Sequence, residues 1–279
     1  MNIDTALLTE RFNRYARSFY SDNPLIHENI VLKEKHTHRV CLFAREIASS
    51  IGLDSHESDL AYLSALFHDV GRFDQFTRYK TFRDNLSENH GTLGIKVIEE
   101  QSFLKDLSPD DEKLIIEAVR NHNRISVDET LDTRTILHAK IIRDADKLDI
   151  IALHLDYFEQ REHTPQPGLE ASFSNEPGYS SEIIDLIMQS SPIPHALRKN
   201  YNDFILTQLA WLLDLNFPYS FRYALEHAYV EKILTHLPAE DRIRNAGDHV
   251  RAEITRREKI DFISTADKKN HNTPEPKIL

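Results

Sequence analysis

The sequence predicts an all-α fold, and three observations support this prediction. Apolar residues recur at helical spacing along nearly the whole chain. Runs of β-branched and aromatic residues with a period of two are missing, so the strand signal is weak. Only 7 of the 279 residues are glycine, which weakens the strand signal further. We expect a helical bundle with additional helices toward the C-terminus.

Helical spacing defines the individual elements, with boundaries uncertain by about two to four residues. The predicted helices cover 4–20, 36–51, 57–70, 87–106, 109–122, 132–160, 179–190, 195–216, 218–236 and 239–260. Ser108 begins one helix as its cap, because a proline and two acids follow in the first turn. Ser87 is predicted to cap the helix before it.

The chain divides into an N-terminal domain, residues 1–160, and a C-terminal helical layer, residues 161–263. Between them, 161–178 contain three prolines and two glycines, which predict a long loop that serves as a lid or a connector. The apolar and aromatic run 204–230 predicts packing against the first domain, with a homodimer face as the alternative. Residues 264–279 are polar and are predicted to be disordered.

Composition limits the classes of function. With 40% hydrophobic and 28% charged residues, the chain is typical of a globular protein that folds unaided. A net charge of -11 argues against broad binding to nucleic acid. No apolar stretch approaches the ~20 residues of a membrane span, and the N-terminus lacks the apolar core of a signal peptide. The single cysteine, Cys41, cannot form an internal disulfide, so we expect a cytoplasmic protein.

Several acidic and histidine side chains fall on apolar helix faces. His36 heads a stripe that continues through Val40 and Ala44, whereas His38 points about 200° away and is expected at the surface or behind a ligand. His68 and Asp69 close a helix, where both side chains can reach one ion. Asp146 lies on an apolar face, where an unpaired carboxylate would cost several kcal/mol.

Two more histidines behave in the same way. His122 ends an apolar stripe, and His90 lies in the first turn of a helix with an apolar face. Nitrogen and oxygen ligands without sulfur suit Mn, Fe, Ni, Mg or Zn better than Ca. The sequence therefore predicts a site for one or two divalent ions, with an aspartate bridging them when there are two.

The order of these residues resembles that of the HD-domain superfamily of metal-dependent phosphohydrolases. The resemblance covers roughly residues 30–152 and rests on the runs HTHRV, FHDVGRF, ENHGTLG, RNHN and RDADKLD. It implies an all-helical fold and metal ligands at His36, His68, Asp69 and Asp146. It also implies that His90 and His122 are the additional ligand pair of members with two ions.

The chain departs from the patterns of several HD subgroups. Leu32 stands where the cyclic-dinucleotide phosphodiesterases have glutamate, and no Gly-Tyr-Pro run follows. The motif around His68 lacks the Glu-Asp pair of the stringent-response hydrolases and the His-rich run of the deoxynucleotide triphosphohydrolases. These substrates are disfavoured, and we expect a phosphate mono- or diester, such as a nucleotide or another small phosphorylated metabolite.

The predicted mechanism uses water that the metal activates to attack phosphorus. Asp69 bridges the ions, and Arg72 or Lys147 offsets the developing charge. The segment 72–83 alternates aromatic and basic residues and is either a substrate wall or a loop pinned to the core. Asp149 is either a surface acid or a hydrogen-bond partner of a ligand histidine.

Two other classes of function stay open. Some helical relatives use the same ligands in a di-iron oxygenase, and ligands alone do not separate this activity from hydrolysis. A non-catalytic module that senses nucleotides or metals is the other alternative.

Overall fold

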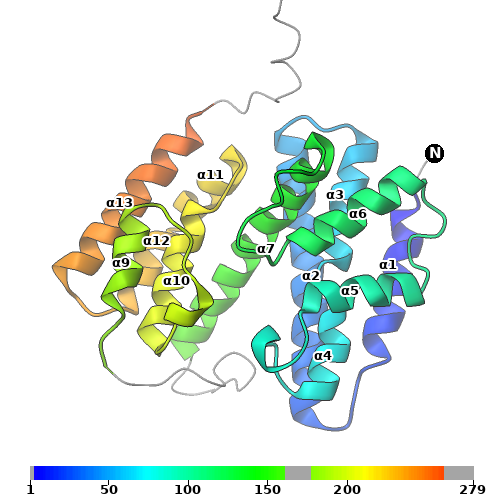
Figure 1. Cartoon of the computed structure of the whole chain (residues 1–279), viewed down its shortest axis with the longest axis horizontal. Coiled ribbons are helices and arrows are strands. Elements are labelled where there is room, and N and C mark those ends of the chain that lie inside the picture. The colour runs from blue at the N-terminus through cyan, green and yellow to red at the C-terminus, as the bar shows by residue number, and fades with distance from the viewer. Residues whose placement is uncertain (1–2, 161–176, 261–279) are drawn as a thin grey trace, which may run out of the picture.

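The computed structural model describes residues 3–160 and 177–260, and within these ranges it is all-α, with no β-strand. The prediction of the fold class is confirmed. Figure 1 shows two groups of helices that pack side by side. The first group contains α1 (Thr5–Arg17), α2 (Pro24–Ser50), α3 (Ser55–Phe67), α4 (Gly71–Tyr79), α5 (His90–Glu100), α6 (Pro109–Asn121) and α7 (Thr133–Gln160). The second contains α9 (Ser181–Met188), α10 (Tyr201–Leu213), α11 (Pro218–Glu226), α12 (Tyr229–Thr235) and α13 (Asp241–Glu258).

Each group has its own hydrophobic core, and α7 contributes to both. Ile141 and Ala145 of α7 lie in the core of the first group, whereas Leu148 and Ile151 lie in the core of the second. Helix α7 therefore joins the two groups, as its central position in Figure 1 shows. The domain boundary near residue 160 stays a prediction. Residues 161–176 of the predicted loop and the predicted tail 264–279 lie outside the described residues.

Two helix starts show how the local sequence sets the fold. Ser108 caps α6, as predicted, because its hydroxyl accepts a hydrogen bond from the Asp111 amide. The predicted cap at Ser87 is wrong. Asn89 caps α5 instead, and its side chain accepts from the Thr92 amide at 3.0 Å. His90 is therefore the first residue of α5.

Other predicted boundaries need correction. Helix α2 begins at Pro24 rather than at residue 36, because Asn23 caps it and proline fits the first helical position. His36 thus lies in the middle of a long helix. Residues 71–79 form α4 instead of a loop. The predicted helix 218–236 is two helices, separated at Ala228, whose φ is 53°.

Within residues 3–160 and 177–260, none of the helices combines the length and the apolar character that a membrane span requires.

Candidate metal centre

Asp69 lies at the centre of the candidate metal centre. Its Oδ2 atom is 3.5 Å from His68 Nε2 and 3.7 Å from His36 Nε2. Its Oδ1 atom is 3.5 Å from His90 Nε2 and 3.9 Å from His122 Nε2. Two groups of ligand atoms that can hold a metal ion therefore share this carboxylate.

Asp146 extends one of these groups. Its Oδ1 atom is 3.1 Å from His36 Nε2 and 3.8 Å from His68 Nε2. We call His36, His68, Asp69 and Asp146 the first half-site, and Asp69, His90 and His122 the second half-site. The Asp146 side chain is 29% exposed, whereas the other ligands are buried, so the centre is reached from the side of Asp146.

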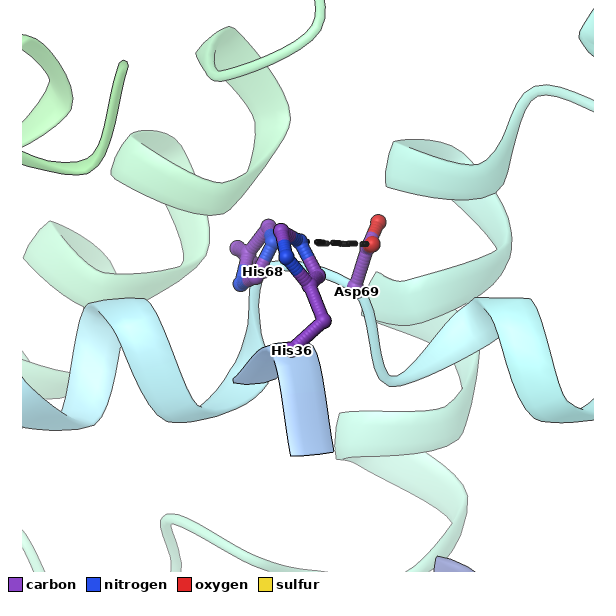
Figure 2. Close-up of side chains that lie close together, drawn as sticks. All are labelled: His36, His68 and Asp69. Atoms are coloured by element: carbon purple, nitrogen blue, oxygen red, sulfur yellow. Dashed lines mark ion pairs between the residues drawn. The ribbon is translucent and has the colours of Figure 1, made fainter. Parts of the chain in front are cut away.

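Five short segments bring these side chains together. Figure 2 shows His36 approaching from α2 and His68 and Asp69 from the turn after α3. His90 is the first residue of α5, and His122 follows the last residue of α6. Because both histidines lie at helix ends, their rings reach past the backbone toward Asp69.

Gly71 lets these ends approach one another. A Cβ atom at Gly71 would lie 2.5 Å from the Gly94 nitrogen and 2.6 Å from the His90 carbonyl oxygen. Both contacts are with backbone, which cannot move aside as a side chain would. The start of α4, two residues after Asp69, can therefore lie against α5 only with glycine at this position.

Each ligand histidine is held through its Nδ1 atom. Nδ1 of His36 is 2.6 Å from Asp149 Oδ2, and Nδ1 of His90 is 2.8 Å from Asp84 Oδ2. Nδ1 of His68 lies 2.6 Å from the Ala65 carbonyl oxygen, and Nδ1 of His122 lies 2.6 Å from that of Val119. Because carboxylates and carbonyls accept hydrogen bonds, the proton is assigned to Nδ1, and Nε2 is left for a cation.

Three observations show that these residues fit divalent metal. The buried Nε2 atoms of His36 and His68 have no hydrogen-bond partner among the described residues. Nε2 of His90 lies 2.9 Å from Nε2 of His122, and two lone pairs at this distance repel unless a cation lies between or beside them. Two ligands about 2.1 Å from one ion are at most about 4.2 Å apart, and every nitrogen–oxygen separation given above is shorter.

The electrostatics of the centre favour the ligand forms of these groups. Burial alone would raise the pKa of Asp69, but Lys33, His68 and Arg72 hold it well below its usual range. Burial lowers the pKa of His68 and of His90. Burial and the neighbouring His90 lower the pKa of His122 to about 3, so its ring stays neutral. His36 differs, because the carboxylates of Asp146 and Asp149 beside its ring outweigh burial and the charge of Lys33 and raise its pKa.

Two basic side chains lie against the shared carboxylate. Lys33 Nζ is 2.7 Å from Asp69 Oδ2, and Arg72 Nε is 3.2 Å from Asp69 Oδ1. The Phe82 ring lies beside both, 5.3 Å from Lys33 Nζ and 5.7 Å from the Arg72 guanidinium carbon. Arg72, which we singled out from the sequence, is therefore in contact with the centre.

The sequence alone did not identify Lys33 and Asp84 as residues of the centre. Lys33 lies three residues before His36 on the same face of α2, and this spacing would have identified it if the helix had been extended to Pro24. Asp84 lies in a short 3-10 helix, Asp84–Leu86, and nothing in its local sequence pairs it with His90.

Three further residues considered in the sequence are not metal ligands in the structure. Lys147 Nζ is 2.8 Å from Asp214 and lies outside the ligand cluster. His38 Nε2 is 2.8 Å from Asn13 Oδ1 and does not take part. Asp149 is the hydrogen-bond partner of His36, and Arg39 also binds its carboxylate, at 2.5 Å.

The described part of the chain is all-helical and contains a buried cluster of histidines and aspartates that could hold a divalent metal. Residues 34–151 match the family model described as HD domain, so this segment is similar to the HD-domain family. The matched segment contains all the ligands of both half-sites. The HD domain is typical of metal-dependent hydrolases. Comparison with curated proteins found no match to the chain.

Proposed function

We propose that the chain is a phosphohydrolase that cleaves a phosphate mono- or diester with the help of one or two divalent ions. The observation that supports this proposal best is that two basic side chains, Lys33 and Arg72, contact Asp69 within the cluster of metal ligands. A phosphate ester approaching a chain of net charge -11 needs local positive charge, and Lys33 and Arg72 supply it beside the ligands.

The ligand histidines and Arg72 have different roles in the proposed reaction. When bound, a divalent ion activates water and neutralises phosphoryl oxygens. The Nδ1 contacts of the four histidines orient their rings before substrate arrives, which lowers the cost of assembling the site. Arg72 is anchored by Gln75 Oε1 at 2.8 Å and by the Phe82 carbonyl, so its guanidinium is fixed where charge develops during phosphoryl transfer.

Phosphate release from a panel of mono- and diesters, measured with Mn, Mg, Ni, Fe and Zn, tests this proposal. We expect turnover with at least one metal and its loss in Asp69→Ala, by about a thousandfold or more, equivalent to about 4 kcal/mol in the barrier. Asp241→Ala is the control, because that carboxylate is exposed on α13. Turnover retained in Asp69→Ala would refute the role of the centre.

Oxygen uptake on the same panel separates the alternatives. Oxygen consumption that depends on iron and substrate, without phosphate release, would support the di-iron oxygenase. Lys33→Met gives a further test. A hydrolase should lose affinity for the phosphate ester, whereas an oxygenase with an uncharged substrate should not. Binding of nucleotides or metals without turnover of either kind would support the sensing module.

A further inference from the structure

Two partly buried arginines, Arg83 and Arg198, have no partner for their charge. Among the described residues, neither guanidinium forms an ion pair or donates a hydrogen bond. The other arginines of these residues all have such a partner except Arg222, which is exposed on α11 and is hydrated by solvent. A cation that is shielded from water and lacks a counter-charge loses hydration without compensation.

The chain on either side of Arg83 is fixed to the metal centre. The Phe82 carbonyl accepts a hydrogen bond from Arg72, and the Asp84 carboxylate lies 2.8 Å from His90 Nδ1. Figure 1 shows the connection between α4 and α5, which contains Arg83, on the side of the first helix group that faces the second. The Arg83 side chain therefore starts at the edge of the centre, next to the second group.

Arg198 approaches from the second helix group. It follows the short 3-10 helix η2 (His195–Leu197) and precedes α10. The amide of the next residue, Lys199, donates to Asp203 Oδ2 at 3.0 Å, which fixes the backbone at this point. Burial and the nearby charge of Arg83 lower the pKa of Arg198 to about 10, so Arg198 is still protonated at neutral pH. The two guanidinium groups are close enough to repel each other.

The carboxylates nearest in sequence to these arginines are engaged elsewhere. Asp84 accepts hydrogen bonds from His90 and from Gln75 Nε2. Both oxygens of Asp203 accept from backbone amides at the starts of α9 and α10. Neither carboxylate is left to neutralise the two arginines, which leaves a place for an anion from outside the chain.

Building on the proposed function, we propose that Arg83 and Arg198 bind a second anionic group of the substrate, a phosphate or a carboxylate, while the scissile phosphate lies at the metal ligands. A guanidinium presents a planar pair of N–H donors that matches both groups, and two guanidinium groups can bind one anion together. The bound anion removes the repulsion between the two arginines. The substrate is then a compound with two anionic ends, rather than an ester with an uncharged organic group.

Phosphonates test this subsite without turnover, because activated water does not hydrolyse their carbon–phosphorus bond. The metal-loaded protein, freed of excess metal, is titrated by calorimetry at constant ionic strength. The ligands are ethane-1,2-, butane-1,4- and hexane-1,6-bisphosphonate and the monophosphonates of the same chain lengths. We expect at least one bisphosphonate to bind about tenfold more tightly than its monophosphonate, equivalent to about 1.4 kcal/mol. An equal gain with the phosphonocarboxylate of that length assigns the subsite to either anion, and a smaller gain assigns it to phosphate.

Substitutions of the two arginines locate the gain. Arg83→Gln and Arg198→Gln should each reduce it to about threefold or less, because one of the two guanidinium groups is lost. Arg222→Gln is the matched control, since it removes the same charge from an exposed position on α11 and should keep the full gain. Equal affinities for bisphosphonates and monophosphonates in the wild type would overturn the proposal. A full gain in both Arg83→Gln and Arg198→Gln would overturn it as well.

Thermal unfolding without ligand separates a subsite from a structural pair. Because the two charges repel each other, Arg83→Gln and Arg198→Gln should leave the unfolding midpoint unchanged or raise it. A lower midpoint in both variants would show that the arginines stabilise the fold, and it would contradict the proposal.

The subsite and the proposed hydrolysis fail separately. A bisphosphonate gain that depends on Arg198, without phosphate release from any ester, would support the subsite and refute the hydrolase. Phosphate release without any gain from a second anion would refute the subsite and leave the hydrolase standing.

Discussion

The two half-sites share Asp69 but differ in charge. The first half-site adds the carboxylate of Asp146, 3.1 Å from His36 Nε2, and Asp149 lies behind the His36 ring. In the described part of the chain, the shared Asp69 is the one carboxylate near Nε2 of His90 and of His122.

The neighbouring cations reinforce this difference. The Arg72 guanidinium lies 3.3 Å from His90 Nε2 as well as against Asp69, so it repels an ion in the second half-site. Lys33 faces the first half-site, but there two carboxylate ligands offset its charge. The half-sites contain equal numbers of histidines, but the first has more negative charge and should hold its ion more tightly.

The largest predicted effect compares one ligand from each half-site. Asp146→Ala should remove the tighter of two binding steps, and His122→Ala the weaker one, because each variant deletes a ligand of one half-site only. Phosphate release should fall at least about a hundredfold in Asp146→Ala, since that variant loses the ion held by more negative charge. The metal content of each variant after dialysis shows which ion has been lost. Loss of the weaker ion in Asp146→Ala would reverse the comparison.

Gly71→Ala is expected to damage the contact between the half-sites. Its Cβ atom would meet the backbone of His90 and Gly94, forcing α4 and α5 apart, at a cost of about 1–3 kcal/mol in the free energy of unfolding. The second half-site should lose metal affinity first, because His90 moves with α5.

Gly94→Ala is the matched control for this prediction. A Cβ atom there meets Val70 Cγ1 at 3.5 Å, an ordinary contact, and alanine favours the helix. Chemical denaturation with parallel metal titration measures both variants. A Gly71→Ala protein as stable as Gly94→Ala would contradict the close approach of the two helices.

A smaller effect is expected in the pH dependence of the metal-free protein. His68, His90 and His122 have pKa values lowered by burial, so the unfolded chain binds protons that the folded chain does not. Stability should therefore fall as the pH decreases from about 6.5 to 4, by up to about 1.4 kcal/mol per pH unit for each such histidine. His36 has a raised pKa, so its contribution is present at low pH and is lost as the pH rises.

Substituting one histidine from each half-site compares their contributions to the pH dependence of stability. His122→Asn should make the slope of stability against pH shallower, whereas His36→Asn should make it steeper. Urea denaturation in EDTA between pH 7.5 and 5 measures the slopes. Identical slopes in the two variants would show that the histidines of the half-sites do not differ in protonation.

The fold class and the ligand cluster could be predicted because the residues that define them recur at helical spacing in the sequence. A charged or imidazole side chain on an apolar helix face, as at Asp146 or His122, stands out without any knowledge of the fold. Ser108 could be identified as a cap for the same reason, since its hydrogen bond is local.

Contacts between distant segments could not be predicted in this way. Asp84 holds His90, and Gln208 holds His154 across 54 residues, yet neither has a local pattern that names its partner. Lys33 was missed for another reason. The predicted start of α2 was twelve residues late, so the turn that carries this lysine was not placed on the face of His36.

Titration of the EDTA-treated protein with Mn²⁺ by calorimetry tests whether two ions share Asp69, because it counts the ions and measures their affinities without a substrate. We expect two binding steps in the wild type, the tighter one belonging to the first half-site, and the loss of both in Asp69→Ala. Absence of binding in the wild type, or an unchanged titration in Asp69→Ala, would contradict it.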